Sequence, residues 1–458
     1  MLTLAQAAAE LASGRTTARS LIDQCLERIA DPAGEGGRTF VAVYAEQAQA
    51  SADAMDALRR VGRAPGPYAG IPISIKDLFD VAGEPTAAGS IVLKEAAPAS
   101  AHAPVVARML AQGFVPVGRT NMTEFAFSGL GINPHHGTPR SPWARDAGGQ
   151  GNHTPGGRIP GGSSSGAAVS VADGMAVAAL GTDTGGSCRI PAAFCGVVGY
   201  KPTARRVPLA GVLPLAPSLD SVGPLARSVR CCAVVDAVLA GQVPRMVEAM
   251  ALRGLRLAVP GNMVMEGVDP VVAEVFGRAL NRLGNLGVRV THLSFPQFER
   301  IAAANAKGGL APVEAYAWHR TLLAEQADGY DQQVRKRIER GAAMTGSELI
   351  ALQAARVEIC ASMDATTTPF DAVAMPTTPI LPPRIDALDG EAEYVRINSL
   401  VLRNTSLANF LDRCSISIPA NRPGEAPVGL MLMGETGGDA RLFAIAAGIE
   451  DMIGESYR

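Results

Sequence analysis

Met175-Ala-Val-Ala-Ala-Leu180 runs directly into Gly181-Thr-Asp-Thr-Gly-Gly-Ser187. The first part is short and apolar, and the second is a turn in which adjacent glycines precede a serine. Because glycine has no side chain, such a turn lets several backbone N–H groups point at one spot, as the stabilisation of an oxyanion requires. Ser187 then stands where a nucleophile would stand, although Gly-Gly-Ser turns are frequent and an idle serine is the plain alternative.

Two other segments supply chemistry that such a serine needs. The loop Gly161-Gly-Ser-Ser-Ser-Gly166 precedes the apolar residues 167–171, a pattern typical of a loop that feeds a helix N-terminus, although a plain turn is also compatible with it. Lys76 ends the apolar run Ile71-Pro-Ile-Ser-Ile75, the pattern of a strand. Burial there would favour the neutral amine and make Lys76 a general base. The structural alternative is an ammonium group that reaches water or pairs with Asp77 or Asp80.

Taken together, these segments predict a serine hydrolase that does not use histidine. A weak hydroxyl nucleophile needs an adjacent base, and that base is held by a third group. Lys76 can be the base, and a serine of the upstream loop can relay the proton of Ser187 to it. None of the six histidines lies in an HxxxH or HExxH spacing, so we expect no metal site and no cofactor.

Several motifs of the chain resemble those of the amidase signature family. The similarity is dense over residues 69–224 and looser over the rest. The motifs are Gly70-Ile-Pro-Ile-Ser-Ile-Lys-Asp77, Gly118-Arg-Thr-Asn-Met-Thr-Glu-Phe125, Pro160-Gly-Gly-Ser-Ser-Ser-Gly166, Gly181-Thr-Asp-Thr-Gly-Gly-Ser-Cys-Arg-Ile-Pro191, Gly199-Tyr-Lys-Pro-Thr203 and Ser218-Leu-Asp-Ser-Val-Gly-Pro224. The resemblance implies an amidohydrolase that converts a linear carboxamide into a carboxylate and ammonia or an amine.

The resemblance also implies a role for each residue of a Ser–Ser–Lys triad. Ser187 matches the nucleophile that carries the acyl group, Ser163 the bridging serine after a cis peptide bond, and Lys76 the base. Cys188 stands where the family more usually has an aliphatic residue, and we do not assign it as nucleophile because no histidine or second base lies near it in the sequence. The oxyanion hole of the family matches the backbone N–H groups of Thr184, Gly185, Gly186 and Ser187.

Two other functions stay open from the sequence. The segment 162–166 fits the G-x-S-x-G pattern of a Ser-His-Asp hydrolase with Ser164 as nucleophile and His292 or His319 downstream, but no strong strand precedes it and Lys76 would have no role. The same family contains the glutaminase subunit of tRNA-dependent amidotransferases, which supplies ammonia to a partner. The acyl group of the substrate is open among aliphatic, aryl and urea-derived amides such as biuret or allophanate.

Bulk composition narrows the classes of partner. The 458 residues are 47% apolar and 18% charged, which favours a well-buried globular core, and the net charge of −2 provides no field for nucleic acid or an anionic membrane. The seven cysteines have no regular spacing, which predicts free thiols in a reducing compartment. With no signal-peptide pattern and no long apolar run, we expect a cytoplasmic protein that acts on a small-molecule amide. A homodimer stays possible.

Alternating strand and helix patterns predict an α/β fold. Strands are expected at 71–76, 114–117, 255–259, 288–293, 416–419 and 428–433, and helices at 104–111, 270–286 and 440–452. Such alternation predicts a central mixed, largely parallel sheet covered by helices on both faces, which is also the fold that the family resemblance implies. We expect one amidase domain over residues 1–458, a catalytic core within 60–230 and a helical region at 300–370 that covers the substrate pocket. The glycine-rich insertion Gly148–Gly157 is expected to reshape the active-site entrance.

Overall fold

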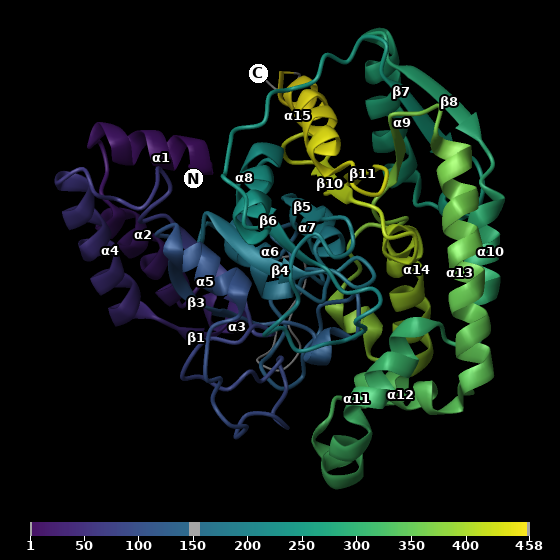
Figure 1. Ribbon diagram of the computed structural model, residues 1–458, viewed down its shortest axis with the longest axis horizontal. Coiled ribbons are helices and arrows are strands. Elements are labelled where there is room, and N and C mark those ends of the chain that lie inside the picture. The colour runs from purple at the N-terminus through teal and green to yellow at the C-terminus, as the bar shows by residue number, and fades with distance from the viewer. Residues whose placement is uncertain (1, 146–155, 456–458) are drawn as a thin grey trace.

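The computed structural model describes residues 2–145 and 156–455 (Figure 1). Within them, one sheet of eleven strands runs in the order β1-β3-β2-β4-β6-β5-β10-β11-β9-β7-β8. The strands are β1 (Phe40–Val43), β2 (Pro72–Lys76), β3 (Val115–Thr120), β4 (Ala178–Thr182), β5 (Val198–Lys201), β6 (Val222–Ala226), β7 (Arg256–Pro260), β8 (Arg289–Leu293), β9 (Ala372–Pro376), β10 (Ser415–Pro419) and β11 (Gly429–Met433).

The directions of the strands confirm a mixed sheet and correct its expected balance. Among the described residues, parallel pairing joins β3, β2 and β4 on one side and β9, β7 and β8 on the other. The strands between β4 and β9 pair antiparallel throughout, and so do β1 and β3. The sheet is therefore not largely parallel. β5 and β6, like β10 and β11, are consecutive strands with no helix between them, and strands connected in this way pair antiparallel.

Helices cover both faces of this sheet, as predicted. Along β11, Leu430 and Leu432 belong to one buried apolar cluster while Met431 and Met433 belong to another, because successive side chains of a strand point to opposite faces. The helices are α1 (Leu4–Ser13), α2 (Ala18–Ala30), α3 (Gly36–Thr39), α4 (Ala45–Arg60), α5 (Pro104–Ala111), α6 (Ser165–Ala172), α7 (Arg189–Cys195), α8 (Val229–Leu239), α9 (Pro270–Asn285), α10 (Pro296–Ala304), α11 (Leu310–Gln326), α12 (Gln332–Glu339), α13 (Gly346–Thr367), α14 (Glu391–Phe410) and α15 (Asp439–Glu455).

Two groups of helices make the two covering layers. Residues of α5, α8 and α15 join the first apolar cluster, and residues of α10, α13 and α14 join the second. In Figure 1, α1, α2 and α4 lie at the N-terminal end of the molecule, while α10 and α13 lie at its opposite side. The predicted helical region at 300–370 forms as α11, α12 and α13, with short 3-10 turns between them.

The local predictions hold where an apolar pattern is strong. β2 ends at Lys76, and α5 has the bounds expected from its leading proline. Of the insertion at 148–157, only residues 156 and 157 are described, so the expectation that it reshapes the active-site entrance lies outside the described residues. No helix of the described ranges is long and apolar enough to cross a lipid bilayer.

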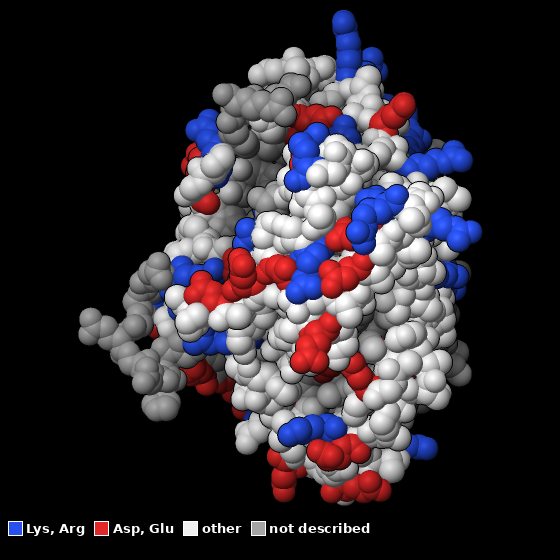
Figure 2. Space-filling model, turned by 90° about the vertical axis from the view of Figure 1, so that its left-hand side faces the viewer, with Lys and Arg blue, Asp and Glu red and all other residues white. Residues whose placement is uncertain are grey.

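Surface charge is interspersed on the face formed by the N-terminal helices. Figure 2 shows acidic and basic side chains next to one another across the described part of this face. The ion pairs there include Arg15–Glu10 at 2.8 Å and Arg19–Asp53 at 2.8 Å. Neighbouring charges of opposite sign cancel at a distance, so this face does not present the one-sign field that attracts a polyanion.

Candidate active site

Lys76 lies where two parallel strands end together. β2 ends at Lys76 and β4 ends at Thr182, and because the two strands are parallel their carboxyl ends meet at one edge. The Nζ atom of Lys76 lies 2.7 Å from Oγ1 of Thr182. Both side chains are buried, and Lys76 is fully so.

The serine loop completes the surroundings of the Lys76 amine. Nζ lies 2.8 Å from Oγ of Ser163 and 3.0 Å from Oγ of Ser164. The peptide bond between Gly162 and Ser163 is cis, as the family resemblance implies. The Ser164 hydroxyl donates to the carbonyl of Thr182 at 3.2 Å, so its proton is already engaged. The Ser163 hydroxyl makes no other hydrogen bond with a described side chain, and its proton is available for transfer.

Burial dominates the electrostatics of Lys76. Desolvation lowers its pKa to about 8, and the more distant Cys188, Asp183 and Asp220 offset only part of this effect. The hydrogen-bond partners of Nζ are all hydroxyl groups, and none is a carboxylate. An amine without an acidic partner loses its proton easily, which suits a base.

The turn that carries Ser187 is joined to the serine loop. The backbone N–H of Ser164 donates to the carbonyl of Ser187 at 3.2 Å. Ser187 lies in the wall of a cavity, and its hydroxyl has no hydrogen-bond partner among the described residues. The N–H groups of Thr184, Gly185 and Ser187 likewise have none there, whereas that of Gly186 donates to Oδ1 of Asp183 at 2.8 Å.

Asp183 organises this turn from inside the protein. Its carboxylate accepts from the N–H of Cys188 at 3.1 Å and forms a two-pronged ion pair with Arg189, at 3.0 and 2.9 Å. Asn409 of α14 donates to the same carboxylate at 2.9 Å. Burial alone would raise the pKa of Asp183, but the Arg189 guanidinium outweighs it and lowers the pKa to about 2. The carboxylate is therefore a permanent anion that fixes the backbone of the turn.

Close approach to α14 explains one glycine of the turn. Gly186 has a φ of 137°, and a Cβ atom placed on it would lie 2.2 Å from Oγ1 of Thr405. The same hydroxyl donates to the carbonyl of Gly185 at 2.6 Å. Only glycine allows α14 to support the turn at this distance.

A cavity of about 170 Å³ opens at Ser187. It is walled by segments that are distant in sequence: the residues after η1 (Glu124–Ala126), the stretch from α10 to α11, and α14. Its lining includes Ala126, Phe127, Ser128, Thr184, Gly185, Ser187, Leu215, Leu219, Ile301, Asn305, Leu310, Arg337, Leu402, Ser406, Asn409 and Phe410. The helical region expected at 300–370 contributes to these walls, whereas the contributions of α14 and of Leu215 and Leu219 were not predicted.

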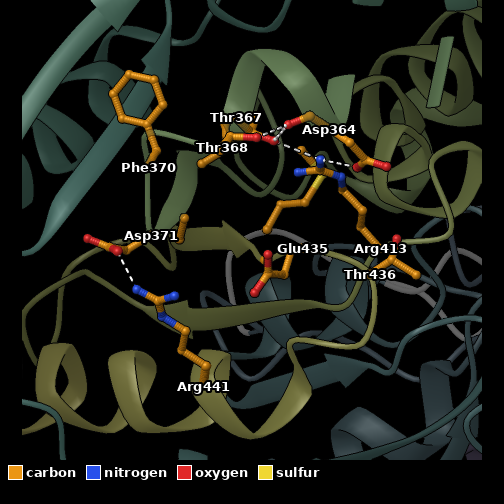
Figure 3. Close-up of a pocket in the computed structure, with 13 residues that line it drawn as sticks. Asp364, Thr367, Thr368, Phe370, Asp371, Arg413, Glu435, Thr436 and Arg441 are labelled. Atoms are coloured by element: carbon orange, nitrogen blue, oxygen red, sulfur yellow. Dashed lines mark hydrogen bonds and ion pairs between the residues drawn. The ribbon is translucent and has the colours of Figure 1, made fainter. Parts of the chain in front are cut away.

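A second cavity, of about 250 Å³, lies at the C-terminal end of α13, beside β9 and α15 (Figure 3). Four of its charged side chains are engaged in two pairs: Arg413 donates to Asp364 at 2.5 Å, and Arg441 pairs with Asp371. It shares no lining residue with the cavity at Ser187. Ser187, the nucleophile expected from the sequence, lines the first cavity and not the second.

Neither His319 nor His292, the two histidines that the alternative Ser-His-Asp function would use, forms a hydrogen bond with the serine loop. His319 contacts the Tyr330 hydroxyl at 3.0 Å inside an aromatic group, and His292 lies on the edge strand β8. Within the described ranges, no histidine bonds to Ser164, whose hydroxyl faces Lys76 and Thr182. Cys188 is buried, its Sγ lies 3.6 Å from the carbonyl oxygen of Gly223, and burial raises the pKa of its thiol.

A family model described as Amidase matches residues 20–443. The chain belongs to the amidase family and is an enzyme that hydrolyses amide C–N bonds. It is 37% identical to the 2-amino-5-chloromuconic acid deaminase of Comamonas testosteroni, over 100% of this chain and 97% of that protein. It is 34% identical to a glutamyl-tRNA(Gln) amidotransferase subunit of Chromohalobacter salexigens, over 97% of this chain and 95% of the relative.

Solved structures agree with this assignment. An amidase of known structure superposes with a TM-score of 0.87 at 32% identity, over 98% of this chain and 99% of the other. The peptide amidase of Stenotrophomonas maltophilia superposes with a TM-score of 0.78 at 25% identity, over 98% and 96% of the two chains. The similarity spans the whole chain, which includes the C-terminal half where the sequence motifs were sparse.

Proposed function

We propose that Ser187 is the nucleophile of this amidase, that Ser163 relays its proton and that Lys76 is the base. The observation that carries the proposal is the buried Lys76 amine, whose hydrogen bonds all go to hydroxyl oxygens. A neutral amine in this place accepts a proton from Ser163 while it donates to Ser164 and Thr182. A histidine-free relay of this kind fulfils the need of a hydroxyl nucleophile for an adjacent, fixed base.

The reaction begins when the amide carbonyl reaches the Ser187 turn. Ser163 gives its proton to Lys76 and takes that of Ser187, whose Oγ forms a bond to the carbonyl carbon. Because the Ser187 hydroxyl has no partner in the described residues, its hydrogen bond to Ser163 forms with the bound substrate, as catalytic hydrogen bonds often do. The N–H groups of Thr184, Gly185 and Ser187 stabilise the oxyanion.

The second half of the reaction releases both products. The proton passes through Ser163 to the leaving nitrogen as the C–N bond breaks, and ammonia or an amine departs. Water, deprotonated through the same relay, then attacks the acyl ester on Ser187. The carboxylic acid leaves, and the proton returns to the serine.

Replacement of the nucleophile tests this mechanism. In Ser187→Ala we expect kcat to fall by about 10⁴-fold or more, because the acyl group has no acceptor. Ser406→Ala removes another hydroxyl from the wall of the same cavity and should retain most activity. Ammonia release over a panel of carboxamides is the assay, and circular dichroism checks that each variant folds.

Cys188 provides the counter-test for the nucleophile. Cys188→Ala should keep kcat within a few-fold, since its thiol is buried and protonated. Full turnover in Ser187→Ala together with loss in Cys188→Ala would overturn the assignment.

A second candidate function is ammonia supply to a partner, as the names of the amidotransferase relatives suggest. In that case the chain would hydrolyse glutamine, and its activity would depend on a partner protein. A glutaminase assay of the purified chain, combined with a measurement of its size in solution, separates the two functions. Hydrolysis of other carboxamides by the chain alone favours the independent amidase.

A further inference from the structure

The packed helix α12 (Gln332–Glu339) places Arg337 at the wall of the cavity that contains Ser187. It lies in the last turn of α12, whose Val334 and Ile338 are buried in one apolar cluster with Phe125. Asp331 caps the helix by accepting from the N–H of Gln333 at 2.8 Å. The backbone N–H of Asp331 donates to the buried carboxylate of Glu124 at 2.7 Å, which joins α12 to the segment before Phe127.

The guanidinium of Arg337 has no anionic partner. Among the described residues it makes no hydrogen bond and no ion pair, and its Nε is buried without a partner. It stacks over the ring of Phe127, with Cζ 4.7 Å from the ring centroid. The neighbouring cations of the same helix differ, since Arg335 pairs with Glu339 at 2.7 Å and Lys336 with Glu391 at 2.6 Å.

Arg337 is half-buried and its Nε is fully buried, and a cation in such a place without a counter-charge is costly for the fold. Desolvation lowers the pKa of Arg337, and the nearby Arg340 lowers it further, although Tyr394 acts in the opposite direction. The ring of Phe127 covers one face of the planar Arg337 guanidinium. The N–H groups at the edge of the guanidinium stay free to form two parallel hydrogen bonds with one anion. The geometry is that of a receptor for a planar anion.

Arg337 is also the one charged side chain among the described residues that line this cavity. Most of the other walls are apolar, with Phe127, Leu215, Leu219, Ile301, Leu310 and Phe410 among them. The cavity volume of about 170 Å³ has room for a short carbon chain. The cavity therefore combines a nucleophile, a short apolar passage and one cation.

We propose that Arg337 binds a carboxylate of the substrate, so that the enzyme acts on monoamides of short dicarboxylic acids. The inference rests on the proposed role of Ser187. The carboxylate would take the free edge of the guanidinium, the carbon chain would lie against the apolar walls, and the amide at its other end would reach Ser187.

Matched pairs of substrates test the inference. Succinamic and adipamic acids carry the carboxylate, whereas succinamide and adipamide have the same chains with a neutral amide in its place. For the wild type we expect kcat/KM to be at least about 100-fold higher for one of the acids than for its diamide, since two charge-assisted hydrogen bonds are lost with the diamide. Arg337→Met should remove this preference mainly through KM, and Arg337→Lys should restore part of it. Arg335→Met, on the same helix, should leave it unchanged.

A binding measurement makes the outcome independent of turnover. In the Ser187→Ala background, succinate or adipate should bind by calorimetry, and the added Arg337→Met should weaken that binding by a similar factor. Equal binding with and without Arg337, or diamides that are hydrolysed as well as the acids, would overturn the inference while leaving Ser187 as nucleophile. Dicarboxylate binding through Arg337 in an enzyme that hydrolyses no amide would instead contradict the proposed function alone.

Discussion

In the proposed mechanism, the surroundings of Lys76 set the pH at which the site works. Its folded-state pKa of about 8 lies below the ordinary 10.5 because the amine is fully buried. The base form is the neutral amine, so kcat/KM should rise with pH and level off above about 8. A pH–rate profile measures this directly, and a profile that falls through this range would contradict a lysine base.

The lowered pKa of Lys76 also makes the free energy of unfolding depend on pH. Between the folded pKa of about 8 and the unfolded value of 10.5 the unfolded chain binds more protons, so the fold gains stability as pH rises through this window. Lys76→Met lacks this titration. From pH 7 to pH 9.5 we expect the wild type to gain about 2 kcal/mol of unfolding free energy relative to Lys76→Met. Urea unfolding at both pH values measures the difference, and a constant difference would mean that the pKa of Lys76 is not lowered.

The candidate catalytic residues could be predicted from short sequence motifs, whereas the residues that hold them in place could not. Lys76, Ser163 and Ser187 stand in local patterns that the family resemblance could match. Thr182 and Asp183 lie in the same quoted stretch, but their roles depend on which groups the folded chain brings beside them. Arg337 had no signal at all, because an arginine on a charged helix is ordinary until the structure shows that it lacks an anion.

Asp183 connects the Ser187 turn to α14, because its carboxylate accepts hydrogen bonds from both the turn and Asn409. In Asp183→Asn the Arg189 guanidinium would stay buried without its anion, which typically costs about 3–5 kcal/mol. We expect that loss in chemical unfolding, together with a lower kcat at unchanged α-helix content. Glu435→Gln changes an exposed carboxylate elsewhere and serves as the control. An Asp183→Asn enzyme with wild-type stability would show that the ion pair does not support the turn.

Elements with strong periodicity were predicted well, and the sheet directions were not. The amphipathic pattern at 270–286 became α9 (Pro270–Asn285), and the apolar run at 428–433 became β11. The pairing of β5 with β10 joins residues more than two hundred positions apart, and no local pattern specifies whether such strands run parallel or antiparallel. That is why a largely parallel sheet was expected where the middle is antiparallel.

At the scale of the molecule, one sheet contains strands from both halves of the chain, and the cavity at Ser187 is walled by both. A single domain should therefore unfold in one step. Trp143 reports on the N-terminal half and Trp318 on α11, so Trp143→Phe and Trp318→Phe leave one probe each. We expect the fluorescence midpoints in urea to agree with each other and with circular dichroism, after correction for the stability of each variant. Separate midpoints would indicate two independently folding parts.

The central claim is that Ser187 accepts the acyl group through a relay from Lys76 without histidine, and covalent labelling tests it most directly. A sulfonyl fluoride reacts with an activated serine, whose Oγ displaces fluoride and leaves a stable sulfonyl ester of known mass. Peptide mapping should locate the label on Ser187 in the wild type, and labelling should slow by orders of magnitude in Lys76→Met and Ser163→Ala. A label on Ser164 or Cys188, or an undiminished rate without Lys76, would contradict the account.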